Sequence, residues 1–573
     1  MLGRQVVTSG AVTRVDDNGF FLQDPTGDGD PRTPDAVFVF TGTSPTVKAG
    51  QCVRLGGRVV EFRAGGGAKA APPVTELHDV SAVQVLGDGC EPKPVEVALP
   101  LSEGLDPRLL QGMLVNLHGP LTVQQNYFLG RFGQLTLAAG GRLQAPTHRF
   151  RPGPAARALA RDNAARQVLL DDGSTRQHPA SVPFLGGDGT VRAGDQVAEV
   201  TGVIDVGPAE PGGSSPAWKI LPTKPLRWLG ANPRTAAPAP VGGTLKVAGV
   251  NVDNFFSTPA DGRAGCLPSR TPADCRGARS PLEFGRQRAK LVAELAAIDA
   301  DIVGLMEIEN NGPTALQALV DALNARAGVR AYARVADPPE GSGRDAIKVA
   351  LIYKSARVRP VGPARSDSQA VHDRWPLAQT FEAITGAATR ARLNVVVSHF
   401  KSRRCGGATG VDLDQGDLQG CWNHRRVLQA QALRRFAAGL AARSGVEDTL
   451  LIGDFNAYAR EDPLRQLAVR GAAAGSAAPG FVDEAARFDP SGYSFVFDSA
   501  AGRLDQVFAS AALSARVTGV AEWHINADEP PLLDYSLAFR APACAACAPD
   551  RYAPTPYRAS DHDPVVVGLR LGR

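Results

Sequence analysis

Apolar and polar residues alternate in two different ways along this chain of 573 residues. Up to about residue 230, Gly, Pro and Asp separate short apolar runs, and five of these runs lie at 5–15, 18–24, 36–42, 52–62 and 73–86. Runs of this length and spacing predict a small β-barrel of the OB type. From residue 245 onward, strand-like runs alternate with longer amphipathic stretches such as 283–300, which predicts a layered α/β domain.

The first part of the chain also contains an internal repeat. The run 48–53 has a counterpart 144 residues later at 192–197, and both lead into a second apolar pair. A constant offset indicates a second copy of a similar unit. We therefore predict an OB-fold-like barrel over 1–94, a second OB-like β domain over 95–230, a Pro/Ala/Gly-rich linker over 231–244 and the α/β domain over 245–573.

Four phenylalanines of the first predicted barrel allow two interpretations. Phe20, Phe21, Phe38 and Phe40 could stack against the bases of a nucleic-acid strand. Their alternation along half-buried strands favours positions in the barrel core for most of them.

Polar side chains follow the predicted strands of the α/β domain where each strand ends. The strands 246–250, 301–306, 393–398 and 450–453 are followed by Asn251, Glu307, His399 and the pair Asp454 and Asn456, and the series continues with Asp505, Asp561 and His562. Each residue alone has a plain alternative, because a Glu or His after a strand is usually a surface residue and Asp454 with Asn456 could form an Asx turn. Their recurrence at successive strand ends predicts one catalytic site.

The eight cysteines indicate the cellular compartment in which the protein is found. They form four near pairs, Cys52 with Cys90, Cys266 with Cys275, Cys405 with Cys421 and Cys544 with Cys547. An even number in loop sequence favours disulfides and an extracellular, secreted protein, whereas a zinc site at Cys544 and Cys547 would lack a second cysteine pair at a familiar spacing. The first residues show no apolar signal region, so we expect a mature or trimmed form.

Composition narrows the function only slightly. The net charge of +4 permits a polyanionic substrate without requiring one. Because no run of about 18 apolar residues occurs, we expect no membrane span. We expect a monomer.

The ordered set Asn251, Glu307, His399, Gly453-Asp-Phe-Asn456, Asp505 and Ser560-Asp-His-Asp-Pro564 resembles the endonuclease/exonuclease/phosphatase superfamily, which has the DNase I-like fold. The segments 345–353 and 398–402, the cysteine pairs and the β-rich first part resemble ExeM/NucH-type extracellular endonucleases. The resemblance implies a four-layer α/β sandwich with the site at the top of two packed sheets. It also implies a metal-dependent endodeoxyribonuclease that cleaves extracellular DNA with little sequence preference, for example for nutrient use or biofilm remodelling.

The resemblance also implies roles for single residues. Asn251, Glu307 and Asp561 would hold Mg²⁺, with Mn²⁺ or Ca²⁺ as alternatives, since hard cations prefer oxygen ligands. His562, held by Asp505, would take a proton from water or stabilise the transition state. Asp454 would orient the water or act as the base, Asn456 would bind a phosphate oxygen and His399 would be the general acid.

Several other residues are expected near the substrate. Asp253 could join the metal ligands or face solvent, and we favour solvent. Arg288, Arg403 and Tyr353 are predicted to bind substrate, together with the loop 401–422. DNA is the expected substrate and RNA a possible one. The alternatives are an inositol-polyphosphate phosphatase or a sphingomyelinase, and a nucleic-acid-binding protein with an inactive nuclease domain.

Overall fold

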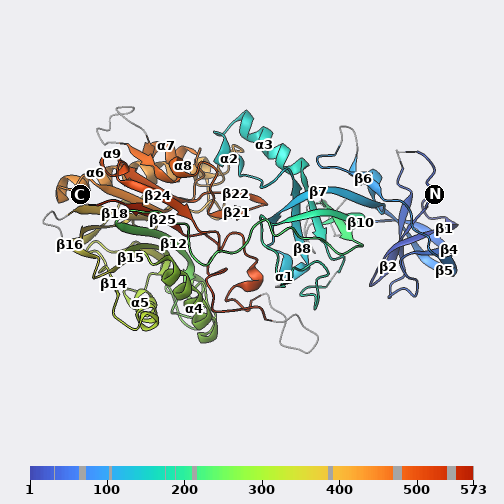
Figure 1. Ribbon diagram of the computed structural model, residues 1–573, viewed down its shortest axis with the longest axis horizontal. Coiled ribbons are helices and arrows are strands. Elements are labelled where there is room, and N and C mark those ends of the chain that lie inside the picture. The colour runs from blue at the N-terminus through green and yellow to red at the C-terminus, as the bar shows by residue number, and fades with distance from the viewer. Residues whose placement is uncertain are drawn as a thin grey trace.

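The computed structural model describes residues 1–30, 33–63, 73–101, 106–174, 176–187, 189–208, 216–384, 391–468, 480–538 and 550–571. Figure 1 shows an elongated molecule in which a small N-terminal barrel, a second β-rich unit and a larger α/β unit follow one another in a row. The C-terminus lies in the α/β unit, at the end of the molecule opposite the N-terminus.

The first unit is a closed five-stranded barrel with the strand order β1-β2-β3-β5-β4. Its strands are β1 (Gln5–Asp16), β2 (Gly19–Gln23), β3 (Ala36–Phe40), β4 (Gln51–Phe62) and β5 (Val74–Asp88). Phe20 fills the barrel core beside Val12 and Leu55, while Phe21 packs at 4.9 Å against Phe38 and reaches Val203 of the next unit. Phe20 and Phe21 are therefore core residues, and neither is free to stack on a base.

The second unit has the same strand order as the first. Its elements are β6 (Val95–Val97), η1 (Pro107–Leu110), β7 (Leu114–Gln125), α1 (Leu129–Phe132), β8 (Gln134–Ala139), α2 (Pro146–Arg149), α3 (Pro154–Ala165), β9 (Gln167–Asp171), β10 (Gln196–Pro208) and β11 (Pro216–Pro222). Its sheet runs β10-β11-β9-β8-β7-β6, and a β10–β7 pairing closes it. In both units the third and fifth barrel strands, β3 with β5 and β9 with β11, pair in parallel.

Two six-stranded sheets form the α/β unit. The first has the order β14-β15-β13-β12-β25-β24, and the second β16-β17-β18-β19-β23-β20. The strands are β12 (Leu245–Phe255), β13 (Ile302–Glu309), β14 (Tyr332–Arg334), β15 (Ile347–Lys354), β16 (Val358–Ser366), β17 (Leu377–Ala383), β18 (Arg392–His399), β19 (Thr449–Asp454), β20 (Phe481–Asp483), β23 (Asp505–Ser510), β24 (Val517–Glu522) and β25 (Val565–Leu569), with a separate hairpin of β21 (Phe495–Phe497) and β22 (Ala500–Gly502). The helices are η2 (Pro272–Asp274), α4 (Pro281–Ile298), α5 (Thr314–Ala327), η3 (Gly410–Asp412), α6 (Asn423–Ser444), α7 (Asp462–Ala468), α8 (Glu484–Phe488), α9 (Ala511–Ser514) and η4 (Pro531–Leu533).

Apolar side chains hold these elements in four layers. One buried cluster lies between the two sheets, a second joins α4 and α5 to the first sheet and a third joins α6 and α7 to the second sheet. Gly249 and Gly304 bring the sheets close together, because a Cβ there would come within 2.8 Å of Ile452 and 2.7 Å of Val397. The predicted layered α/β sandwich is therefore confirmed.

Buried acidic residues join the second β unit to the α/β unit. Asp528 accepts hydrogen bonds from Arg142 at 2.6 Å and Asn232 at 2.8 Å, and Glu529 accepts two from Arg234 at 2.7 and 2.8 Å. Both carboxylates are fully buried, so the partner charges are needed to offset their lost hydration. No helix within the described ranges is long and apolar enough to cross a membrane.

Candidate active site

Four strand ends bring the predicted polar residues together at one edge of the sandwich. β12 pairs in parallel with β13 in the first sheet, and β18 pairs in parallel with β19 in the second. Parallel strands end at the same edge, so Asn251 and Glu307 face His399 and Asp454. Asn251 links the sheets, since its Nδ2 donates to Glu307 Oε1 at 3.2 Å and lies 3.5 Å from Asp454 Oδ2.

The histidine near the C-terminus is held by a carboxylate. His562 Nδ1 lies 2.7 Å from Asp505 Oδ2, which also accepts the Ser494 hydroxyl at 2.7 Å. Burial opposes the charged imidazolium, but Asp505, Asp561 and Asp454 raise the pKa of His562 well above its usual value. This contact leaves Nε2 free to meet reacting atoms, and Nε2 lies 4.0 Å from Asp454 Oδ2.

The segment Gly453-Asp-Phe-Asn456 is both a tight turn and part of the site. The Asn456 backbone N–H donates to Asp454 Oδ1 at 2.8 Å, and Asn456 Nδ2 donates to Phe400 O at 3.2 Å. Burial raises the pKa of Asp454 to about 7; His562 opposes this shift and Asp505 adds to it. The two sequence interpretations are therefore compatible, because the turn is what fixes the carboxylate in the site.

Arg374 is a site residue that the sequence prediction missed. Its Nη1 lies 3.1 Å from His399 Nε2, and its Nη2 donates to Phe400 O at 2.6 Å. Burial and then the charge of Arg374 hold the pKa of His399 well below its usual range. Arg374 precedes β17 instead of following a strand, so a search for polar residues at strand ends passes over it.

The contact with Arg374 bears on the general-acid role expected for His399. A neutral imidazole that accepts from Arg374 through Nε2 carries its proton on Nδ1, which is buried without a hydrogen-bond partner among the described residues. His399 Nε2 also lies 3.3 Å from Asp454 Oδ2. Nε2 therefore lies between a guanidinium that can donate to it and a carboxylate that can accept from it, and the general-acid role stays a prediction.

Asp253 is half-buried at the site beside Asp561 and Glu307, so it does not simply face solvent as expected. Its backbone has φ +50°, and burial, Asp561 and Glu307 raise its pKa to about 8. Burial and the charge of Asp561 likewise raise the pKa of Glu307. These shifts show that Asp253, Glu307 and Asp561 share a region of negative potential.

The oxygen atoms of this region fit a divalent cation of the magnesium type. In the described part of the chain, no three His, Cys, Asp or Glu side chains are close enough to form a complete ligand set. Mg²⁺ needs no such set, because it keeps several waters and binds through one or two carboxylates. A bound cation would offset the mutual repulsion among the carboxylates of Asp253, Glu307 and Asp561. The side-chain oxygen of Asn251 would be an additional, neutral ligand.

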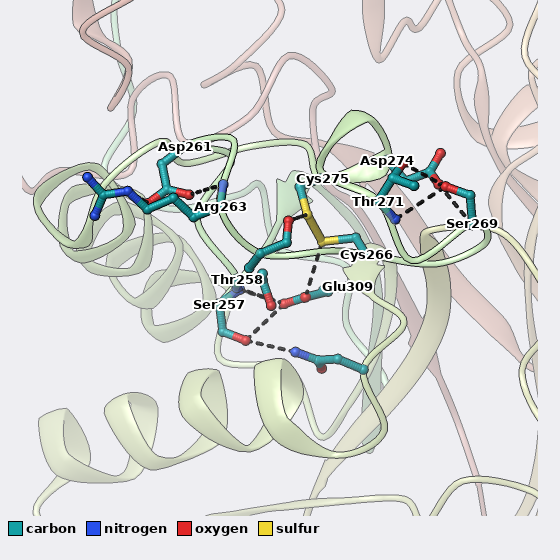
Figure 2. Close-up of a disulfide and its surroundings, with 12 residues drawn as sticks. Ser257, Thr258, Asp261, Arg263, Cys266, Ser269, Thr271, Asp274, Cys275 and Glu309 are labelled. Carbon is teal, nitrogen blue, oxygen red and sulfur yellow. Dashed lines mark hydrogen bonds and ion pairs between the residues drawn. A yellow bond between two sulfur atoms is a disulfide. The ribbon is translucent and has the colours of Figure 1, made fainter.

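The segment after β12, with a disulfide beside it, holds the end of the strand that carries Glu307. Figure 2 shows the Glu309 carboxylate accepting the Ser257 N–H at 2.8 Å, the Ser257 hydroxyl at 2.9 Å and the Thr258 N–H at 3.1 Å. The disulfide Cys266–Cys275 lies beside this carboxylate, with Cys266 Sγ 3.9 Å from Glu309 Oε1. The end of β13 is thereby tied to the end of β12, two residues from Glu307.

Three of the four predicted cysteine pairs are disulfides. The bonds are Cys52–Cys90, Cys266–Cys275 and Cys405–Cys421. The fourth pair, Cys544 and Cys547, lies outside the described residues.

Tyr353 and Arg403, two of the residues predicted to bind substrate, are not placed to contact a substrate in the active site. Tyr353 pairs with Ile302 at the start of β13, because β15 is antiparallel to it, so the tyrosine lies at the end of the sheet opposite Glu307. Arg403 Nη1 donates to both Glu461 oxygens at 2.8 and 2.6 Å, so its charge is used inside the protein. The Arg288 guanidinium lies 5.3 Å from the centroid of the Phe284 ring on the same helix, and among the described residues no contact places it on a site residue.

A known protein family matches this part of the chain. The model of the Endonuclease/Exonuclease/phosphatase family matches residues 251–562, which includes both ends of the predicted residue set. The chain therefore belongs to the endonuclease/exonuclease/phosphatase family, whose members are hydrolases of the nuclease and phosphatase type. No curated protein matches the chain.

Solved structures were also found. The human Nocturnin catalytic domain is 15% identical, with 57% of this chain and 94% of that chain covered and a TM-score of 0.34. An endonuclease/exonuclease/phosphatase from Bacteroides vulgatus is 14% identical, with 57% and 99% covered and a TM-score of 0.33. A humanized D. rerio TDP2 is 14% identical, with 56% and 97% covered and a TM-score of 0.32.

Proposed function

We propose that this protein is a divalent-metal-dependent endonuclease of the ExeM/NucH type that hydrolyses phosphodiester bonds of extracellular DNA with little sequence preference. The observation that supports it most is the His562–Asp505 pair beside Asn251, Glu307 and Asp454. This arrangement supplies a positioned imidazole, an orienting carboxylate and oxygen ligands at one strand edge. The three disulfides support an oxidising, extracellular compartment.

We assign a separate role in catalysis to each residue of the site. Asp505 accepts a hydrogen bond from the Nδ1–H group of His562 and fixes the ring, so that Nε2 meets the reacting atoms. Asp454 lies on the other side of this position and orients the attacking water. Asn251, Glu307, Asp253 and Asp561 would hold the metal ion, which when bound supplies positive charge that stabilises the pentavalent phosphate.

The barrel architecture supports a polymeric substrate over an inositol phosphate or a sphingolipid. A closed barrel with the order β1-β2-β3-β5-β4 is typical of OB-type units, and such units bind single strands. We propose that both β units are of this type. A small phosphorylated substrate would not need the additional binding surface of these units.

Plasmid cleavage tests this function. Supercoiled plasmid incubated with the protein and Mg²⁺ is expected to be nicked, then linearised and fragmented, and an excess of chelator should abolish all three changes. Mn²⁺ and Ca²⁺ are tested in parallel, together with an RNA substrate and a small phosphomonoester. Intact plasmid with every metal, or faster turnover of the phosphomonoester, would overturn the proposal.

A variant assigns the chemistry to the site. His562→Ala should lower the rate of cleavage by about 10²- to 10⁴-fold, the range of a lost general acid or base, and should leave DNA retention unchanged. His118→Ala is the matched control, because His118 is exposed in the second unit beside Glu96. Equal loss of cleavage and retention in His562→Ala would show that the residue is structural.

A further inference from the structure

The α2–α3 segment of the second unit, residues 145–165, packs directly against the catalytic site. Ala145 belongs to a buried cluster with Tyr458 and Leu504, which follow Asn456 and precede Asp505 in the chain. In Figure 1, α2 lies on the side of the second unit that faces the α/β unit, and α3 runs along the upper edge of the second unit. The surface of this segment therefore continues the surface around the site.

Hydrogen bonds fix this placement. The Thr147 hydroxyl donates to Glu461 Oε1 at 2.6 Å, and the Thr147 carbonyl accepts the Arg460 N–H at 3.0 Å. Across the β21–β22 hairpin, the Ala501 N–H donates to Leu143 O at 2.9 Å and its carbonyl accepts the Ala145 N–H at 2.8 Å. The segment is thus joined to the strand-end motif and to the hairpin beside His562.

The segment carries positive charge that is not neutralised locally. Arg149, Arg151, Arg157 and Arg161 are exposed, and none of the four forms an ion pair with an acidic residue in the part of the chain that the structure describes. The nearest acidic residue in sequence, Asp162, is paired with Arg166 at 2.8 Å. No Asp or Glu occurs in the sequence from 107 to 161. Arg157 and Arg161 are four residues apart on α3, so they share a helix face.

Exposed aromatic rings lie next to these charges and next to His562. Phe150 stands between Arg149 and Arg151 and is 41% exposed. Phe497 in β21 is 67% exposed and stacks at 6.5 Å on Phe495, whose ring lies 4.6 Å from that of His562. Large apolar rings exposed beside unpaired arginines are typical of surfaces that bind unstacked bases and their phosphates.

We infer that the α2–α3 segment and the β21–β22 hairpin form an extended binding face for a single-stranded stretch of the DNA substrate. The four arginines contact phosphates on one side of the cleaved bond, and Phe150 and Phe497 stack on bases. This inference rests on the proposed nuclease function and adds the second β unit to its substrate site. The face binds through charge and stacking, so it confers little sequence preference.

A variant with four substitutions tests the proposed binding face. Changing Arg149, Arg151, Arg157 and Arg161 to Ala should weaken binding of a fluorescein-labelled single-stranded 20-mer by about ten- to a hundredfold at 0.1 M salt, measured by anisotropy in the presence of chelator. The slope of log Kd against log salt should fall by about 3, because each lost phosphate contact contributes about 0.7 on a single strand. With metal present, kcat/KM for the oligonucleotide should fall by a similar factor, while hydrolysis of bis(4-nitrophenyl) phosphate, which is too short to reach the face, should be unchanged.

The matched control replaces Arg326, Arg330, Arg435 and Arg443 by Ala. These residues are also exposed but belong to α5, the turn after it and the outer side of α6. Equal loss of binding in both variants would overturn the inference, since it would show an effect of net charge alone. Wild-type affinity and salt slope in the test variant would overturn it too. In either case cleavage by the wild-type protein would leave the proposed function standing, whereas no cleavage by any form would refute that function.

Discussion

Four non-glycine residues of the active site have a left-handed backbone conformation. Asp253, Asn254, Glu307 and Asn456 have φ of +50°, +51°, +69° and +47°. Such conformations cost free energy for residues with a Cβ, and they persist where neighbouring contacts fix them. Here the Asn254 N–H donates to Glu307 Oε2 at 2.9 Å, and the Asn456 N–H donates to Asp454 Oδ1. The site oxygens themselves therefore hold the backbone that positions them.

Several carboxylates lie close together between the two β units, and one of them, Asp172, predicts a pH dependence of stability. Burial raises the pKa of Asp172 to about 7. A folded-state pKa above the unfolded value means that stability is greatest below about pH 4 and is lost as pH rises through 7. We expect Asp172→Asn to raise the free energy of unfolding by about 1–2 kcal/mol at pH 8, after allowance for the partial exposure of the group, and to change it little at pH 4.

Urea unfolding at several pH values measures this difference. Asp88→Asn, at an exposed position of the first barrel, is the control and should show no pH-dependent difference from the wild type. A difference between Asp172→Asn and the wild type that is the same at pH 4 and pH 8 would contradict the expectation.

At the scale of elements, the close approach of β18 and β19 decides where Asp454 lies. The two strands pair in parallel from Asn394 with Thr449 to His399 with Asp454. Gly453 has φ +141°, and a Cβ on it would lie 2.0 Å from Ser398 O. Only glycine fits this position, for both its conformation and its space. The glycine of the motif is therefore a condition for the neighbouring aspartate to reach the site.

We expect Gly453→Ala to destabilise the α/β unit by about 3 kcal/mol or more, because the strands must separate to admit a methyl group. Thermal unfolding followed by circular dichroism measures the loss, and plasmid cleavage should fall with it. Gly285→Ala is the control: in α4 a Cβ at this position meets nothing within 4 Å, so the change should be neutral or stabilise by up to about 1 kcal/mol. Equal effects of the two changes would contradict this account of the motif.

At the scale of the whole molecule, a buried ionic network makes the second β unit part of the α/β unit. Glu529 meets Arg192 at 3.0 Å as well as Arg234, and Asp528 also accepts the Tyr493 hydroxyl at 2.7 Å. Two residues before Asp528, Asn526 donates to His562 O at 2.7 Å. The same short segment therefore carries both the docking contacts and a support for the catalytic histidine.

Glu529→Gln is expected to weaken this docking by about 3–5 kcal/mol, since it leaves buried arginine charges without their carboxylate. Scanning calorimetry should then resolve separate transitions for the β-rich part and the α/β unit where the wild type unfolds them together. Glu96→Gln, which removes an exposed partner of His118 at 3.2 Å, should cost less than about 1 kcal/mol. Unchanged calorimetric profiles for Glu529→Gln would show that apolar packing alone holds the units together.

Local patterns in the sequence were enough to predict the layered α/β fold and the strand ends that meet at one edge. Apolar runs that end in Asn251, Glu307, His399 and Asp454 predict strands from local sequence. Parallel pairing of β12 with β13 and of β18 with β19 then brings the ends of these strands to one edge. Cysteines close in sequence likewise predicted the bonds Cys266–Cys275 and Cys405–Cys421.

Contacts that depend on strand register or on distant partners form only in the folded chain and could not be predicted from local patterns. Because β15 is antiparallel to β13, Tyr353 lies at the end of the sheet opposite Glu307. Arg403 forms an ion pair with Glu461 instead of facing the substrate. Arg374 meets His399 only because the loop before β17 folds over the strand edge. The second β unit reaches the site through pairs such as Asn126 with Asp528, which are 402 residues apart. No local pattern encodes such pairs, because each side chain acquires its partner only when the chain has packed.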